Sequence, residues 1–241
     1  MKQRYIKTGG VRLWTVEQGS GMPILMINGG PGLSDYLAPL ARVLEGGGRV
    51  IRFEQRGCGR SSFVEPYNVQ TCIADIEGIR RFLNIKKWIL LGHSWGAALA
   101  LAYVLKHQSN STALIYLSGT GITLDWKEEF HRNQREKSEI QPDCSFPTNI
   151  RVNVDGNESW QNYITQPALQ KKIARLSIPS LILHGVKDLR PSWPAKELAK
   201  LIRGSMFKEI PGAEHIIWET HAKVLKEILF CFLEDIIPKS D

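Results

Sequence analysis

One pentapeptide has the residue types and spacing of a serine nucleophile. Residues Gly92–Gly96 read Gly-His-Ser-Trp-Gly and place Ser94 between two glycines. The pentapeptide follows the apolar segment Trp88–Leu91 and opens a helical pattern that continues from Ala97. Between a buried strand and a helix, the glycines permit a sharp turn that lifts the serine hydroxyl above the sheet, and the helix N-terminus favours developing negative charge. The pattern predicts Ser94 as a nucleophile, with a helix-capping serine as the alternative.

A serine hydroxyl is a poor nucleophile until a base removes its proton. Two downstream residues have the right types and chain order: Asp188 follows the apolar segment Leu181–Leu183, and His215 follows Met206–Ile210. The carboxyl ends of parallel strands meet at one edge of a sheet, where ligands bind in open α/β folds. We therefore expect Asp188 to fix the tautomer of His215 and to stabilise its imidazolium, while His215 moves the proton of Ser94.

Acyl transfer also requires hydrogen-bond donors for an oxyanion. The glycine-rich segment Asn28–Gly32 follows the apolar segment Ile24–Ile27, and glycines let backbone N–H groups approach a ligand closely. We assign the two donors to the backbone N–H groups of Gly30 and Trp95, with a plain turn as the alternative for the glycine segment. A dinucleotide fingerprint that starts at Gly30 would need a glycine where Asp35 stands, and the chain has no GxxxxGK[ST] phosphate loop.

The elements that must position these residues alternate along the chain. Short apolar segments, which predict strands, are separated in most cases by longer segments with helical spacing. Strands that are apolar throughout and alternate with helices favour an α/β fold with a mostly parallel sheet, here of eight strands, covered by helices on both faces. Gly9-Gly10 predicts a tight hairpin, so the sheet begins antiparallel and becomes parallel from about Ile24. The expected strands are Tyr5–Thr8, Val11–Val16, Ile24–Ile27, Val50–Phe53, Trp88–Leu91, Leu114–Leu117, Leu181–Leu183 and Met206–Ile210, and the expected helices are Leu37–Leu44, Cys72–Leu83, Ala97–His107, Ala195–Ile202 and His221–Phe232.

One polar segment interrupts this alternation. Residues 120–178 are too long for an ordinary connection between two strands, and insertions of this length are usually functional lids or disordered linkers. Trp126 and Phe130 are four residues apart in a charged stretch, which predicts an amphipathic helix over another part of the protein. We therefore expect an α/β core formed by residues 1–119 and 179–241, and an ordered lid formed by residues 120–178.

Composition excludes several other classes of protein. The 241 residues include 31 lysines and arginines and 24 acids, a net charge of +7. The basic residues are scattered in pairs without a dense run, so solvated helix faces are favoured over a nucleic-acid site. Four dispersed cysteines form no CxxC pair, and no apolar segment approaches the length of a membrane span. We expect a cytoplasmic protein without nucleic-acid or membrane partners.

Taken together, the motifs resemble the α/β-hydrolase superfamily and, within it, the proline iminopeptidase group. The resemblance covers about residues 1–118 and 179–241, and it implies Ser94, Asp188 and His215 as a catalytic triad. It implies no metal or organic cofactor. The motifs that carry it are Asn28–Gly32, Glu54–Ser61, Gly92–Gly96, His184–Asp188 and Gly212–His215.

The chain departs from the family pattern at three points. The family usually has His where Asn28 stands and Asp where Glu54 stands, and its aminopeptidases carry a longer helical cap whose acids hold the substrate ammonium. In this chain Glu128 and Glu129 are the residues we expect to bind such an ammonium, and Glu136 and Glu139 are further acids of the same segment. Solvated helix charges are the alternative for all four.

The sequence leaves three functions open. The resemblance implies a serine hydrolase that releases N-terminal proline from small peptides through an acyl-enzyme. The short insertion favours a carboxylesterase or lactonase that acts on small acyl substrates. A ligand sensor that keeps the triad without useful turnover is a third possibility, because fold does not fix function.

The nucleophile assignment predicts selective covalent labelling. A fluorophosphonate probe should label the protein once, at Ser94, because only an activated serine reacts fast. Ser94→Ala should abolish labelling and lower kcat by about 10⁶-fold, as loss of a triad nucleophile does. Peptide mapping of the labelled protein checks the site, and labelling that persists in Ser94→Ala would contradict the assignment.

Overall fold

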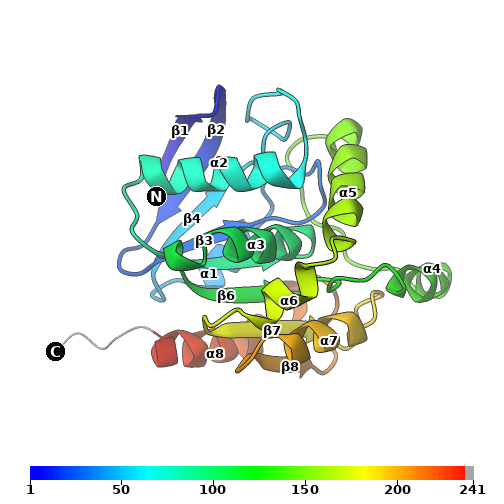
Figure 1. The fold of residues 1–241 in the computed structure, drawn as a ribbon. Helices are drawn as coiled ribbons and strands as arrows, with labels where there is room; N and C mark the ends of the chain where they lie inside the picture. Colours follow the sequence, from blue (N-terminus) through cyan, green and yellow to red (C-terminus); the bar gives the residue numbers. More distant parts are fainter. Residues whose placement is uncertain (237–241) are drawn as a thin grey trace.

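Within residues 1–236, the part of the chain that the computed structural model describes, eight strands form one sheet (Figure 1). Their order across the sheet is β1-β2-β4-β3-β5-β6-β7-β8. The strands are β1 (Lys2–Thr8), β2 (Val11–Gln18), β3 (Pro23–Ile27), β4 (Arg49–Phe53), β5 (Trp88–His93), β6 (Ser111–Leu117), β7 (Ser180–Gly185) and β8 (Met206–Ile210).

The sheet begins as an antiparallel hairpin and continues in parallel. β1 pairs with β2, with Thr8 opposite Val11, and the two turn residues Gly9 and Gly10 have φ of +52° and +79°. A two-residue turn with both φ positive matches the twist of the flanking strands. β2 also pairs antiparallel with β4, whereas every pair from β4 through β3 to β8 is parallel. The predicted fold class is confirmed.

Helices cover both faces of the sheet. On one face lie α2 (Val69–Phe82), α3 (Trp95–Lys106) and α7 (Trp193–Leu201), whose apolar side chains join the core cluster that contains Leu25 and Leu90. On the other face, α1 (Ala38–Val43) and α8 (Ile217–Ile236) join a second cluster. In Figure 1, α2 and α3 run in front of the strands. α3 is buried from Trp95 to Val104 because it packs at the centre of its layer, which an apolar surface all round permits.

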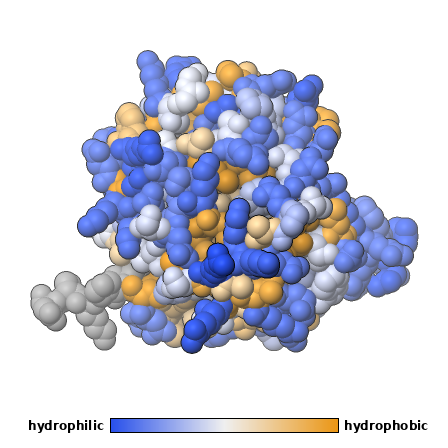
Figure 2. Space-filling view, in the orientation of Figure 1, coloured by the Kyte–Doolittle hydropathy of each residue, from blue (hydrophilic) through white to orange (hydrophobic). Residues whose placement is uncertain are grey.

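The segment between β6 and β7, here called the insertion (residues 120–178), contains α4 (Trp126–Glu136), α5 (Ile150–Ile164) and α6 (Leu169–Ala174). The predicted helix at Trp126 is α4, but it has no buried residue, and it projects from one side of the molecule with a mostly hydrophilic surface (Figures 1 and 2). Its two aromatic rings pack against each other with centroids 5.7 Å apart. α4 therefore makes less contact with the core than its aromatic spacing suggested.

α5 is the insertion helix that docks on the core. Asn149 caps it by accepting hydrogen bonds from the N–H groups of Arg151 and Val152, and Asn149 also donates from its own backbone N–H to the Gly32 carbonyl at 2.9 Å. At Gly156 an added Cβ would lie 3.0 Å from Pro31, a tight contact that favours glycine where the helix crosses the loop. The insertion thereby packs against the glycine-rich segment that follows β3.

None of the helices within residues 1–236 combines the length and apolar character that crossing a bilayer requires.

A buried ion pair fixes the loop after β4 to α2. Arg56 donates from Nε and Nη2 to the two carboxylate oxygens of Asp75, at 2.7 Å and 2.6 Å. Both side chains are almost fully buried. Burial raises the pKa of Asp75, while the Arg56 hydrogen bonds and charge act in the opposite direction. Removing one partner would leave a buried charge without compensation.

We predict that Asp75→Asn lowers the free energy of unfolding by about 3–5 kcal/mol, because it leaves the buried Arg56 guanidinium without its ionic partner. Urea unfolding followed by tryptophan fluorescence measures the change. The matched control is Asp155→Asn, which breaks the more exposed 2.7 Å pair with Arg151 on α5. Exposed pairs of this kind contribute only about 0–1 kcal/mol. Equal losses in the two variants would show that burial of the Arg56 pair has no special importance.

Candidate active site

Ser94 lies in a strained turn between β5 and α3. Its backbone has φ +56° and ψ −121°, and its N–H donates to the Leu117 carbonyl at 2.9 Å. A non-glycine residue in this region costs about 1–3 kcal/mol, so the surroundings must hold it there. Both flanking glycines are required: a Cβ on Gly92 would lie 2.1 Å from the Gly96 carbonyl oxygen, and one on Gly96 would lie 2.0 Å from that of Ile27.

Asp188 and His215 form a short hydrogen bond. His215 donates from Nδ1 to Asp188 Oδ2 at 2.6 Å, and both residues are 8% exposed. The second carboxylate oxygen accepts from the Arg190 backbone N–H at 2.9 Å and from its guanidinium at 3.1 Å. Because Nδ1 of His215 is occupied by a carboxylate, Nε2 is the ring nitrogen that remains for exchange of a proton.

The charge of Asp188 is stabilised by its neighbours. Burial alone would raise the pKa of this carboxyl, but the His215 ring, its hydrogen bond, His184 and Arg190 outweigh burial and hold the pKa below its ordinary value. Asp188 is therefore an anion at neutral pH and can stabilise a positive charge on His215. An aspartate with a depressed pKa stabilises the folded protein above its unfolded-state pKa, and this contribution is lost as pH falls through the folded-state pKa.

Ser94, His215 and Gly30 line one cavity of about 370 Å³. Among the described residues no hydrogen bond joins the Ser94 hydroxyl to the His215 ring, and bonds of this kind often tighten only with substrate bound. The other lining residues are Leu33, Tyr36, His93, Glu139, Ile140, Gln141, Pro142, Cys144, Thr148, Arg190 and Ile216.

Two backbone N–H groups are available beside Ser94. Neither Gly30 nor Trp95 donates its N–H to another described residue, and Gly30 has φ +56°. Gln55, a residue of the motif Glu54–Ser61 to which no role was assigned from the sequence, contacts both segments: its Nε2 donates to the Asn28 carbonyl at 3.2 Å, and its Oε1 accepts from the Trp95 indole at 3.3 Å. The glycine loop and the start of α3 are thus held by one buried amide.

Glu128 and Glu129 do not line the cavity. Both lie in the first turn of α4, and the Glu129 carboxylate accepts from the exposed Trp193 indole at 3.3 Å. The acid that does line the cavity is Glu139, which accepts from Arg190 Nη1 at 2.7 Å and from Nη2 at 3.2 Å. α4 carries Glu128 and Glu129 away from the cavity, and the chain after it returns to the site.

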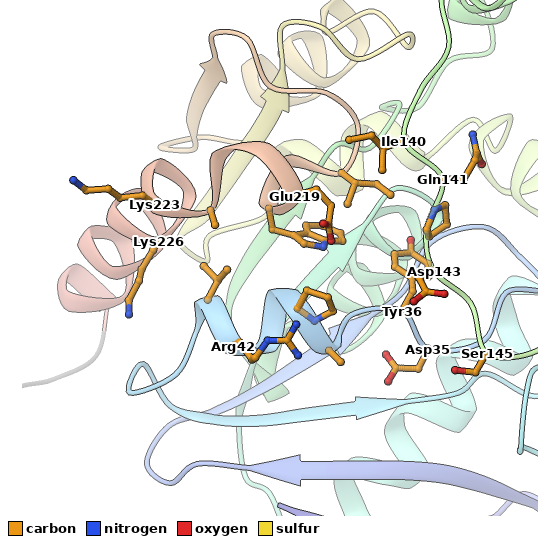
Figure 3. Close-up of a pocket in the computed structure, with 17 residues that line it drawn as sticks. Asp35, Tyr36, Arg42, Ile140, Gln141, Asp143, Ser145, Glu219, Lys223 and Lys226 are labelled. Atoms are coloured by element: carbon orange, nitrogen blue, oxygen red, sulfur yellow. The ribbon is translucent and has the colours of Figure 1, made fainter.

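A larger cavity of about 1010 Å³ adjoins the first. Tyr36, Ile216 and the segment Ile140–Pro142 line both cavities. Figure 3 shows Ile140 and Gln141 on the segment along one side of the larger cavity, with Lys223 and Lys226 of α8 opposite. The segment after α4 therefore lies between the two spaces.

A buried thiol lies in the motif Glu54–Ser61. Burial raises the pKa of the Cys58 thiol to about 12, so it stays protonated and unreactive. Within the described part of the chain, no three His, Cys, Asp or Glu side chains cluster as metal ligands.

Comparison with known proteins places this geometry in a family. A family model described as the alpha/beta hydrolase fold matches residues 22–144. Proline iminopeptidase from Lactobacillus helveticus (strain DPC 4571) is 24% identical over 251 residues, covering 83% of this chain and 85% of that protein.

Two solved structures are similar in fold. A carboxylesterase from Nitrososphaera gargenis has a TM-score of 0.79 at 19% identity, covering 97% of this chain and 98% of that one. Proline iminopeptidase from Mycobacterium smegmatis has a TM-score of 0.76 at 15% identity, with the same coverage. With the family match over half the chain, these findings identify the protein as a hydrolase that belongs to the α/β hydrolase fold family.

Proposed function

We propose that the protein is a serine hydrolase that works through an acyl-enzyme at Ser94. The observation that carries the proposal is the 2.6 Å hydrogen bond between His215 and Asp188, which lies at the cavity that Ser94 and Gly30 also line. Ser94 Oγ attacks the substrate carbonyl while His215 Nε2 accepts its proton and then gives it to the leaving group. The N–H groups of Gly30 and Trp95 hold the oxyanion, and water releases the acyl group by the same steps.

The substrate class we favour is a small peptide with an N-terminal proline. Similarity to the Lactobacillus helveticus enzyme supports it, and so does Glu139, the one carboxylate among the residues that line the cavity. A substrate ammonium needs a carboxylate partner as it leaves water, because an unpaired buried charge costs several kcal/mol. A carboxylate has about four acceptor sites, so Glu139 can bind an ammonium while it accepts two bonds from Arg190.

The second candidate is a carboxylesterase or lactonase. The pairing of Glu139 with Arg190 supports it, because the two charges compensate each other and leave the cavity close to neutral. An uncharged acyl substrate needs no ionic partner. The two candidates use the same nucleophile and differ only in what the cavity wall must bind.

We further propose that the insertion is a lid. Glu139–Pro142, Cys144 and Thr148 contribute to the cavity wall from this segment. Arg190 supports the assignment from the core: its guanidinium binds Glu139 and lies 4.7 Å from the centre of the Phe130 ring. The lid would therefore close on the same loop that carries Asp188.

Substitution of the triad acid is expected to affect turnover more than binding. We predict that Asp188→Asn lowers kcat by about 10⁴-fold, because an amide would hold His215 in the wrong tautomer. Steady-state kinetics with p-nitrophenyl acetate measure the loss, and circular dichroism checks that the variant is folded. A loss smaller than about tenfold would remove Asp188 from the triad.

Substitution of the cavity acid separates the two substrate classes. We predict that Glu139→Gln lowers kcat/KM for proline p-nitroanilide at least tenfold, about 1.4 kcal/mol, and changes kcat/KM for p-nitrophenyl acetate less than threefold. The double variant Glu128→Gln/Glu129→Gln is the matched control, since these acids lie outside the cavity, and it should change neither rate. Equal effects on both substrates, or an inactive parent protein with the anilide, would favour the esterase. A parent protein that turns over neither substrate would favour a ligand sensor.

A further inference from the structure

Tyr36 and His93 are buried polar residues that the triad does not use. The Tyr36 hydroxyl oxygen lies 2.7 Å from the Gly29 backbone nitrogen and 2.7 Å from His93 Nδ1. The other ring nitrogen of His93, Nε2, lies 3.0 Å from the backbone carbonyl oxygen of His215. These contacts form one continuous chain of hydrogen bonds.

The chemistry of its ends fixes the direction of every bond. A carbonyl oxygen can only accept, so His93 Nε2 carries a proton and donates to His215. A backbone N–H can only donate, so Gly29 donates to the Tyr36 oxygen. The remaining phenol proton is then donated to His93 Nδ1, which must be unprotonated. The chain is satisfied when Tyr36 is a neutral phenol and His93 is the neutral Nε2–H tautomer.

The surroundings favour this protonation state. The His93 side chain is buried, with its ring centroid 4.7 Å from that of His215 and 4.7 Å from that of Trp218. Tyr36 stacks on the same tryptophan at 6.4 Å. Burial, and then the nearby His215, hold the pKa of His93 well below its ordinary value, and burial raises that of Tyr36. Both rings pack against Trp218, and they have one hydrogen-bonded arrangement.

The chain of hydrogen bonds connects the carboxyl ends of three different strands. Gly29 precedes the donor Gly30 after β3, His93 is the last residue of β5 and precedes Ser94, and the carbonyl belongs to His215 itself, after β8. We propose that Tyr36 and His93 are positioning residues that hold the oxyanion donor and the catalytic histidine in register with Ser94. This inference rests on the proposed function, because it assigns these two residues to the same site.

The relative positions of Ser94, His215 and the oxyanion donors strongly affect the reaction rate. Catalytic constellations work within a narrow geometry, and displacement by about 1 Å can cost about 10²-fold in rate. Tyr36→Phe removes the hydroxyl alone, which leaves the Gly29 N–H and His93 Nδ1 without partners while the ring stays. The substitution therefore loosens the register without opening a cavity.

The first experiment compares Tyr36→Phe with Tyr103→Phe. Tyr103 is the matched control: it is also buried, and its hydroxyl donates to Glu77 on α2 rather than to a residue at the three strand ends. With p-nitrophenyl acetate we expect Tyr36→Phe to lower kcat at least tenfold, with KM changed less than twofold and a melting temperature close to that of Tyr103→Phe. Binding of a trifluoromethyl ketone, whose adduct oxyanion uses the same donors, should weaken by the same factor. Equal kcat values in the two variants would overturn the proposal.

The second experiment tests whether the two residues act as one unit. In a His93→Gln background, Tyr36→Phe should lower kcat by a smaller factor than in the parent protein, because His93 is the link between the Tyr36 hydroxyl and His215. Losses that multiply independently would overturn the proposal.

Ser94→Ala serves as the reference for both experiments. If Ser94→Ala retains activity, the proposed function fails. If Ser94→Ala is inactive and Tyr36→Phe behaves like Tyr103→Phe, the positioning role alone fails.

Discussion

The positive φ at Ser94 is the constraint on which the rest of the site depends. A serine at φ +56° is strained, so close packing of the surrounding backbone must hold it there. Gly29, Gly92 and Gly96 permit this close packing, since a Cβ on any of them would lie within 3 Å of several neighbouring atoms. The strain of one residue is therefore balanced by the packing of two strands and a helix, which also fixes where the hydroxyl lies.

Buried polar contacts then hold other loops close to Ser94. Arg190 binds Asp188 of the core and Glu139 of the insertion, so one guanidinium joins Asp188 to the cavity wall. Gln55 and Tyr36 act similarly for the glycine loop. These groups are costly to leave unpaired, and each loop therefore has one arrangement that satisfies them.

The strands and core helices were predictable because their signals are local. The eight apolar segments gave all eight strands, and helix boundaries differed by a few residues; α8, for example, begins at Ile217 rather than His221. α5 and α6 were not predicted, since α5 is polar and Asn-rich and α6 is only six residues long. Gly156, unfavourable in an isolated helix, is explained by Pro31, which lies far away in the sequence.

The sequence by itself determined the α/β fold and the candidates Ser94, Asp188, His215, Gly30 and Trp95, because glycine spacing and strand ends place these residue types at one edge of a sheet. The α/β-hydrolase family was indicated by the resemblance of its motifs. Only the tertiary structure decided which acid reaches the cavity and which residues support the site. Glu139 lines the cavity, whereas Glu128 and Glu129 do not. Tyr36, Gln55 and Arg190 were found only through their contacts in the folded protein. Periodicity encodes which face of an element is buried, whereas the partner of a buried polar group depends on how the loops meet in space.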